Sequence, residues 1–142
     1  MNQAEIARLE AYLRRVFASA KLSVAARNDE EGELRAGGKK IADITKEEDE
    51  GETSYFVNLG VSRAPGAAKD APIEAQERAR LETVLRQELG AAGLEVRARP
   101  RKTDSAEVYV GEEFIGAISR DEESREFGYF LTMSILDIDL ED

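Results

Sequence analysis

The chain has 142 residues, with 20 basic and 30 acidic side chains, no histidine, no cysteine and a formal net charge of −10. Because this charge repels phosphate backbones and anionic bilayers, it disfavours nucleic acid and membrane surfaces as principal partners. The missing residue types exclude a disulfide framework, a thiolate metal site and histidine-based acid–base catalysis. No segment approaches the roughly 20 apolar residues that span a bilayer, and the N-terminal residues lack a signal-peptide pattern, so we expect a cytoplasmic protein.

The first predicted element is a helix at residues 4–17, whose apolar side chains recur at the i, i+3, i+4, i+7 spacing of one helical face. These side chains are Ile6, Leu9, Tyr12, Leu13, Val16 and Phe17. A strand at 22–27, a glycine-centred hairpin, an acidic turn at 45–53 and a last strand at 54–62 are predicted to follow. The next residues, 63–73, are rich in proline, glycine and alanine and are predicted to form a linker.

Beyond the linker, the chain repeats itself. The segment ARLETVLR at 79–86 matches ARLEAYLR at 7–14 with a shift of 72 residues. Farther on the shift becomes 74, and the pair Tyr129-Phe130 falls on Tyr55-Phe56. A difference of two residues in one loop explains the change of shift, so the pattern indicates tandem duplication.

We therefore predict an α+β protein with a first repeat at 1–62, a linker at 63–73 and a second repeat at 74–142. Each repeat has the order α-β-β-β-β, with its helix packed across one face of an antiparallel sheet. Half of this chain, about 70 residues, buries too little surface to be stable alone. The two repeats are therefore predicted to pair through equivalent surfaces as an intramolecular pseudo-dimer.

Particular motifs also carry a family resemblance. The sequence RPRKTDSAEVYVGEEFIGAISRDEE at 99–123, the ending ILDIDLED at 135–142 and the opening AEIARLEAYLRRVF at 4–17 are informative. They resemble the C-terminal part and the N-terminal helix of domain-of-unknown-function family 3126, a small alphaproteobacterial family. Its members are single copies about half as long, with no assigned activity, cofactor or catalytic residue. The resemblance therefore supports the predicted repeat and implies no chemistry.

The C-terminal sequence LDIDLED places Asp137, Asp139 and Glu141 on one face of a predicted strand. These carboxylates are candidate partner contacts. A divalent cation is the alternative ligand, but side chains about 7 Å apart along one strand cannot surround an ion without other ligands. We therefore predict no metal site and no cofactor.

Three further candidate partner contacts come from apolar and aromatic positions. Each Tyr-Phe pair is predicted to send one ring into the core and one outward, so Tyr55 and Tyr129 are candidates, although a core role is favoured. The helix at 4–17 has more apolar surface than its repeat, and Val16 is expected to contact the other copy or an external protein.

The segment EVRARPRK places Arg97, Arg99 and Arg101 on one strand face, with Lys102 at its end. Such a stripe of cations can follow phosphates along a nucleic-acid strand. However, Pro100 interrupts the strand, and no aromatic residue interleaves for base stacking. Internal pairing with the acidic tail is the favoured interpretation, and nucleic-acid contact is the alternative.

No nucleophile elbow, phosphate loop, dinucleotide fingerprint or metal motif occurs in the sequence. We therefore expect a non-catalytic protein–protein interaction or adaptor module whose partner is an unidentified protein or a second copy of the chain. Nucleic-acid association through the arginine face is the alternative, followed by a carboxylate-based, metal-dependent enzyme. The expected docking surfaces are the open sheet edges at the two ends of the pseudo-dimer and the exposed helix faces, because an open edge can accept another strand.

Overall fold

The computed structural model describes residues 1–140, within which there are two α-helices, eight strands and one 3₁₀ turn. Copy one consists of α1 (Gln3–Phe17), β1 (Leu22–Ala26), β2 (Glu31–Ala36), β3 (Lys39–Asp49) and β4 (Glu52–Val61). Copy two consists of α2 (Ala75–Leu89), β5 (Leu94–Arg99), β6 (Lys102–Val110), β7 (Glu113–Arg120), β8 (Tyr129–Leu136) and the 3₁₀ turn η1 (Asp137–Asp139). This order confirms the predicted α+β class and the repeated α-β-β-β-β unit.

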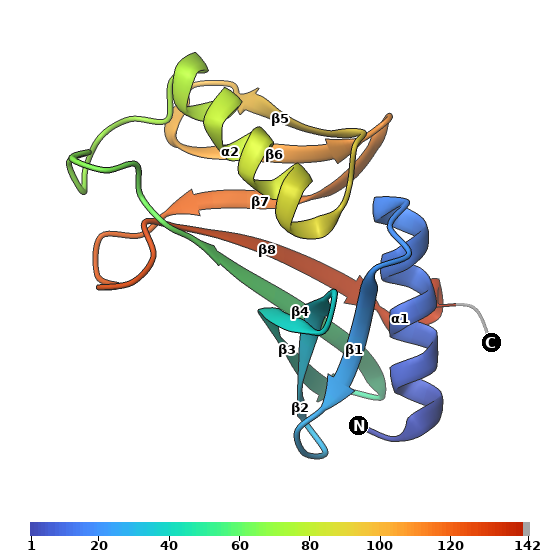
Figure 1. Cartoon of the computed structure of the whole chain (residues 1–142). Coiled ribbons are helices and arrows are strands. Elements are labelled where there is room, and N and C mark those ends of the chain that lie inside the picture. The colour runs from blue at the N-terminus through green and yellow to red at the C-terminus, as the bar shows by residue number, and fades with distance from the viewer. Residues whose placement is uncertain (141–142) are drawn as a thin grey trace.

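All eight strands form one antiparallel sheet in the order β1-β2-β3-β4-β8-β7-β6-β5. The last strands of the two copies, β4 and β8, pair at its centre (Figure 1). Asn58 lies opposite Thr132, the residue at the equivalent position of copy two, and the Thr132 hydroxyl donates to Asn58 Oδ1 at 3.1 Å. A pseudo-two-fold axis therefore passes through this residue pair, which confirms the predicted intramolecular pseudo-dimer.

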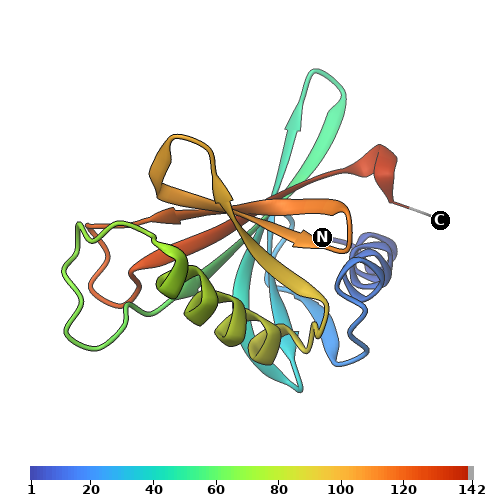
Figure 2. The ribbon, with the colours of Figure 1, turned by 90° about the horizontal axis from the view of Figure 1, so that it is seen from above.

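Both helices lie on the same face of the sheet, α1 against β1 and α2 against β5 (Figures 1 and 2). Their apolar stripes are buried against alternate residues of the central strands, which gives one core shared by both copies. The buried residues of the helices are Leu9, Leu13, Val16, Phe17, Leu81, Leu85 and Leu89. Val16 is only 4% exposed, so it is a core residue; of its two expected contacts, the other copy or an external protein, the external one is not possible.

Each helix also covers the outer edge of the sheet with a Glu–Arg pair, which we call the edge clamp. In copy one, Glu10 Oε1 accepts the Val24 N–H at 3.0 Å and Arg14 Nε donates to the Leu22 carbonyl at 2.7 Å. In copy two, the same contacts join Glu82 to Val96 at 2.9 Å and Arg86 to Leu94 at 2.7 Å. These side chains occupy backbone groups that an added strand would need, so the outer edges are not the open docking surfaces expected from the sequence.

The C-terminal segment differs from the predicted strand. β8 ends at Leu136, and residues 137–139 turn, so that Asp137 and Leu140 lie beside α1. Arg8 of α1 donates to Asp137 Oδ1 at 3.1 Å, to the Asp137 carbonyl at 3.2 Å and to the Leu140 carbonyl at 3.4 Å. The prediction of a single row of carboxylates is therefore wrong. Asp137 forms an ion pair with Arg8, and Asp139 is exposed. Glu141 lies outside the described residues.

Within residues 1–140, neither helix combines the length and the apolar character that a membrane crossing requires.

The edge clamp yields a testable prediction. Replacing Glu10 and Glu82 with alanine leaves the Val24 and Val96 N–H groups without their acceptor, and each loss should lower the free energy of unfolding by about 1–2 kcal/mol. The uncovered edges should also make the double variant self-associate. Urea unfolding and sedimentation velocity measure the two effects, with Gln76→Ala on the exposed surface of α2 as the control. A double variant as stable and as monomeric as the control would contradict the clamp.

Candidate functional site

The tyrosines at equivalent positions of the two repeats lie inside the protein. Tyr55 is 0% exposed and Tyr129 is 2% exposed, and the outward residue of each pair is the phenylalanine. The Tyr55 hydroxyl donates to Glu5 Oε2 at 2.7 Å, and the Tyr129 hydroxyl donates to Glu77 Oε2 at 2.6 Å. Both tyrosines therefore tie a helix N-terminus to a central strand, and neither ring is available as the partner contact proposed from the sequence.

The surroundings of these tyrosine–glutamate pairs shift the pKa values of their members. Burial acts to raise the pKa of Glu5, but hydrogen bonds from Lys46, the Asn2 N–H and Tyr55 outweigh it and hold this pKa at about 2. Lys46 Nζ lies 2.6 Å from Glu5 Oε2. In copy two, burial and the hydrogen bond to Glu77 raise the pKa of Tyr129 to about 12. Glu5 in the folded protein therefore stays ionised well below the pH at which an ordinary glutamate takes up its proton.

The arginine stripe makes internal contacts. Arg97 stacks over the ring of Tyr109 with its guanidinium carbon 4.0 Å from the centroid, and it donates to Glu95 Oε2 and to the Gly111 carbonyl, both at 3.1 Å. Phe114, on the next strand, packs edge-on against Tyr109. Aromatic side chains therefore do lie beside Arg97, which corrects the sequence-based view; they come from neighbouring strands and so are invisible in a single segment.

The other members of the stripe are spread along the β5–β6 hairpin. Arg99 donates to Ser105 Oγ at 3.4 Å, Arg101 occupies the turn with a φ of 64°, and Lys102 begins β6. The predicted pairing between this stripe and the acidic tail does not extend to Asp137, which pairs with Arg8 on the first helix.

The segment predicted as an acidic turn is a projecting hairpin, which we call the acidic arm (residues 46–53). β3 and β4 remain paired out to Asp49 and Glu52, and the two turn residues between them, Glu50 and Gly51, both have positive φ, as a tight type I′ turn requires. Sequence reasoning missed these strands because the apolar alternation of β3 stops at Ile44. The single available signal was the glycine that follows Glu50.

The outer edge of β3 is open along the arm. The pairing of β2 with β3 begins at Glu31, opposite Thr45, and the last contact on this side is the Lys46 N–H donating to the Glu30 carbonyl at 2.7 Å. In an antiparallel ladder, every second residue directs its N–H and C=O to the same side. The Glu48 N–H and C=O therefore face the same side as the Lys46 N–H, beyond the start of β2.

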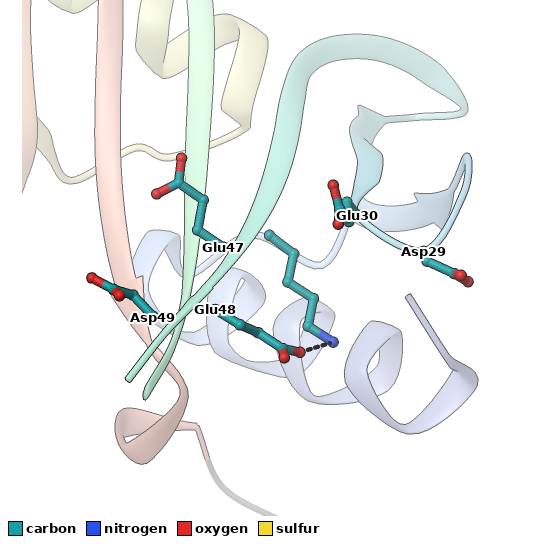
Figure 3. A pocket seen from close by; sticks show the side chains of 6 residues that line it. Asp29, Glu30, Glu47, Glu48 and Asp49 are labelled. Carbon is teal, nitrogen blue, oxygen red and sulfur yellow. Dashed lines mark ion pairs between the residues drawn. The ribbon is translucent and has the colours of Figure 1, made fainter. Parts of the chain in front are cut away.

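A hollow of about 520 Å³ lies at this open edge, and we call it the copy-one hollow. It is lined by Asp29, Glu30, Lys46, Glu47, Glu48 and Asp49. Figure 3 shows Asp29 and Glu30 on one side, from the turn before β2, and the other carboxylates on β3. Lys46, the one cation of the lining, lies 3.2 Å from Glu48 Oε1 and 2.6 Å from Glu5. The hollow thus combines a strand edge with a strong excess of negative charge.

Among residues 1–140, no three acidic side chains come close enough together to hold a metal ion.

Comparison with known families matches the repeated architecture. The model of a family described as proteins of unknown function (DUF3126) matches residues 5–63 and, a second time, residues 77–139. Each matched segment contains most of one helix and the four strands that follow it. No match was found among curated proteins or among solved structures.

The contacts of Glu5 with Lys46, Asn2 and Tyr55, which we call the Glu5 cluster, predict that the stability of the fold depends on pH. Because the pKa of Glu5 falls from 4.5 to about 2 on folding, its stabilisation is fully present above pH 4.5 and is lost as the pH falls towards 2. Between these values, the free energy of unfolding should fall more for the wild type than for Glu5→Gln, by about 1–2 kcal/mol after allowance for solvent screening. Urea unfolding across this pH range tests it, with Glu47→Gln as an exposed control. Parallel curves for the wild type and Glu5→Gln would contradict the cluster's role.

Proposed function

The chain belongs to the DUF3126 family, whose domain it contains twice in tandem, and we propose that it is a non-catalytic interaction module that binds a partner protein at the acidic arm. The observation that carries this proposal is that the arm of copy one has no counterpart in copy two. They share the edge clamp, the buried tyrosine–glutamate pair and the pairing across the pseudo-two-fold axis. These shared contacts build the frame, and the arm is an addition to it.

Copy two folds differently where copy one has the arm. β7 and β8 are paired only over residues 117–120 and 129–132, and the loop between them turns back on itself. Asp121 Oδ1 accepts the N–H groups of Glu123 and Ser124, and the Phe127 ring covers Gly60. Because the frame closes in copy two without a projecting hairpin, the arm is not needed for folding.

Ordering the arm costs conformational entropy that its own contacts offset poorly, which suggests that it serves to bind a partner. A projecting hairpin orders several residues while burying little apolar surface, and its outer edge leaves Glu48 backbone groups to the solvent. The carboxylates along it deter indiscriminate strand pairing and nucleic acid alike. They favour a partner of opposite charge, which makes the surface selective.

Single-stranded nucleic acid is the second candidate, and one observation favours it. Phe114 is 52% exposed beside the stacked Arg97–Tyr109 pair, which offers a base-stacking surface next to cations. Such binding would weaken steeply as salt is added. The carboxylates on the same strands, including Glu95 and Glu107, oppose it, so we place it second.

Site-specific cross-linking tests the proposed function. With p-benzoylphenylalanine at position 48, the full chain should cross-link to a particular protein in native cell extract, because Glu48 lies at the open edge. The same replacement at Glu122, the equivalent position in copy two, is the control. The captured protein is then purified, and calorimetry should show 1:1 binding that weakens about tenfold or more in an E47Q/E48Q/D49N variant. Identical cross-links at both positions, or unchanged affinity, would contradict the proposal.

A further inference from the structure

In copy two, the position equivalent to the copy-one hollow is filled by the chain's own linker. The first pair between β6 and β7, Ser105 with Ser119, corresponds to the first pair between β2 and β3, Glu31 with Thr45. Thr103 therefore lies two residues before Ser105, as Asp29 lies two residues before Glu31. Arg120 directly follows Ser119, as Lys46 directly follows Thr45. The pseudo-two-fold symmetry thus relates one occupied position to one open position.

The contacts of the linker show how this position holds an extended segment. Arg120 Nη1 donates to the carbonyls of Asp70 at 3.1 Å and Ala71 at 3.3 Å. The Thr103 carbonyl accepts the Ile73 N–H at 2.6 Å. Figure 1 shows the linker passing the end of β7 on its way to α2. These three contacts use the backbone of the bound segment and do not depend on its sequence, while the Ile73 side chain is buried in the core as well.

We propose that the copy-one hollow binds an extended segment of the partner protein that carries lysine or arginine, by the contacts that the linker makes in copy two. This inference rests on the proposed function and deepens it. Lys46 takes the role of Arg120 and donates to a carbonyl of the segment: an ammonium group has three N–H donors, of which Glu5 and Glu48 take two. The Asp29 carbonyl takes the role of Thr103.

The open edge adds contacts that copy two does not show. The Glu48 N–H and C=O face the hollow and can pair with the backbone of the segment, as in strand addition. The carboxylates of Glu30, Glu47 and Asp49 then receive its basic side chains.

Charge identifies the occupant as basic. The linker is covalently attached, so its effective concentration near copy two is high and it needs no electrostatic attraction. A segment from another protein has no such advantage, and the five carboxylates of the copy-one hollow against one lysine supply the attraction that it needs. A second copy of the chain, with its own net charge of −10, is repelled over a distance.

The probe for this proposal is a peptide taken from the linker itself. A fluorescein-labelled peptide with the sequence of residues 67–73 and the substitution Asp70→Lys should bind the full chain in fluorescence anisotropy. An E48Q/D49N variant should weaken this binding about five- to tenfold, because two carboxylates of the hollow are lost. The matched control is E122Q/E123Q, which removes the same charge from the occupied position of copy two and should change the affinity less than about twofold. The Glu48 amide resonance should shift when the peptide binds.

Three results would overturn the proposal. Equal losses in the two variants would mean that only the overall charge matters, and equal binding of an Asp70→Glu peptide would mean that the hollow does not select cations. Dimers of the free chain that E48Q/D49N converts to monomers would make a second copy the occupant. The proposed function can fail or survive independently, because cross-linking of a natural partner at position 48 does not require that partner to be basic.

Discussion

The pairing of β4 with β8 is the interaction on which the rest of the structure depends. It runs over eight residue pairs, Ser54 with Leu136 through Val61 with Tyr129, and its helix-facing side chains are buried in both copies. Separated from each other, the two copies would expose the apolar centre of the core and leave two open strand edges. Joined, they form one eight-stranded sheet that carries both helices on one face.

This central pairing also makes each helix dependent on the other copy. Arg8 on α1 holds the residues that follow β8, and Arg80 on α2 donates to the Ser62 carbonyl, just after β4, at 3.0 Å. At the other ends of the helices, Lys21 Nζ donates to the Gln87 carbonyl at 3.0 Å. These contacts between the two copies fix their relative position. The acidic arm, which only copy one has, therefore has a defined place on the surface.

The sequence contained the information for the frame and lacked the information for the site. Helical spacing and the two matching shifts predicted the repeat, the α+β order and the pseudo-dimer, because duplication preserves the positions that fill the core. The edge clamp was not predictable, since Glu10 and Arg14 look like an ordinary exposed pair one helical turn apart until the edge strand is placed beside them. The prediction for the C-terminal segment was wrong for a similar reason: its alternation suits a strand, but Arg8, 129 positions away, binds the Asp137 carbonyl.

The acidic arm shows the same limit. Its charged side chains gave no strand periodicity, and the hollow beside it depends on where β2 begins relative to the end of β3. The occupied position in copy two depends on the path of the linker, which a comparison of the two repeats by sequence alone cannot place. Once the fold is known, the pseudo-two-fold symmetry shows which differences between the copies are not needed for folding.

Residue-resolved urea unfolding, followed by amide resonances of Leu13 in α1 and Leu85 in α2, tests the central claim most directly. Because both helices are anchored to one sheet through β4 and β8, we expect the two resonances to report a single transition. Replacing Leu59, which lies opposite Leu131 at the centre of this pairing, with alanine should move both midpoints to lower urea by the same amount. Two separate midpoints, or a shift confined to α1, would show that the copies fold independently and would contradict the account.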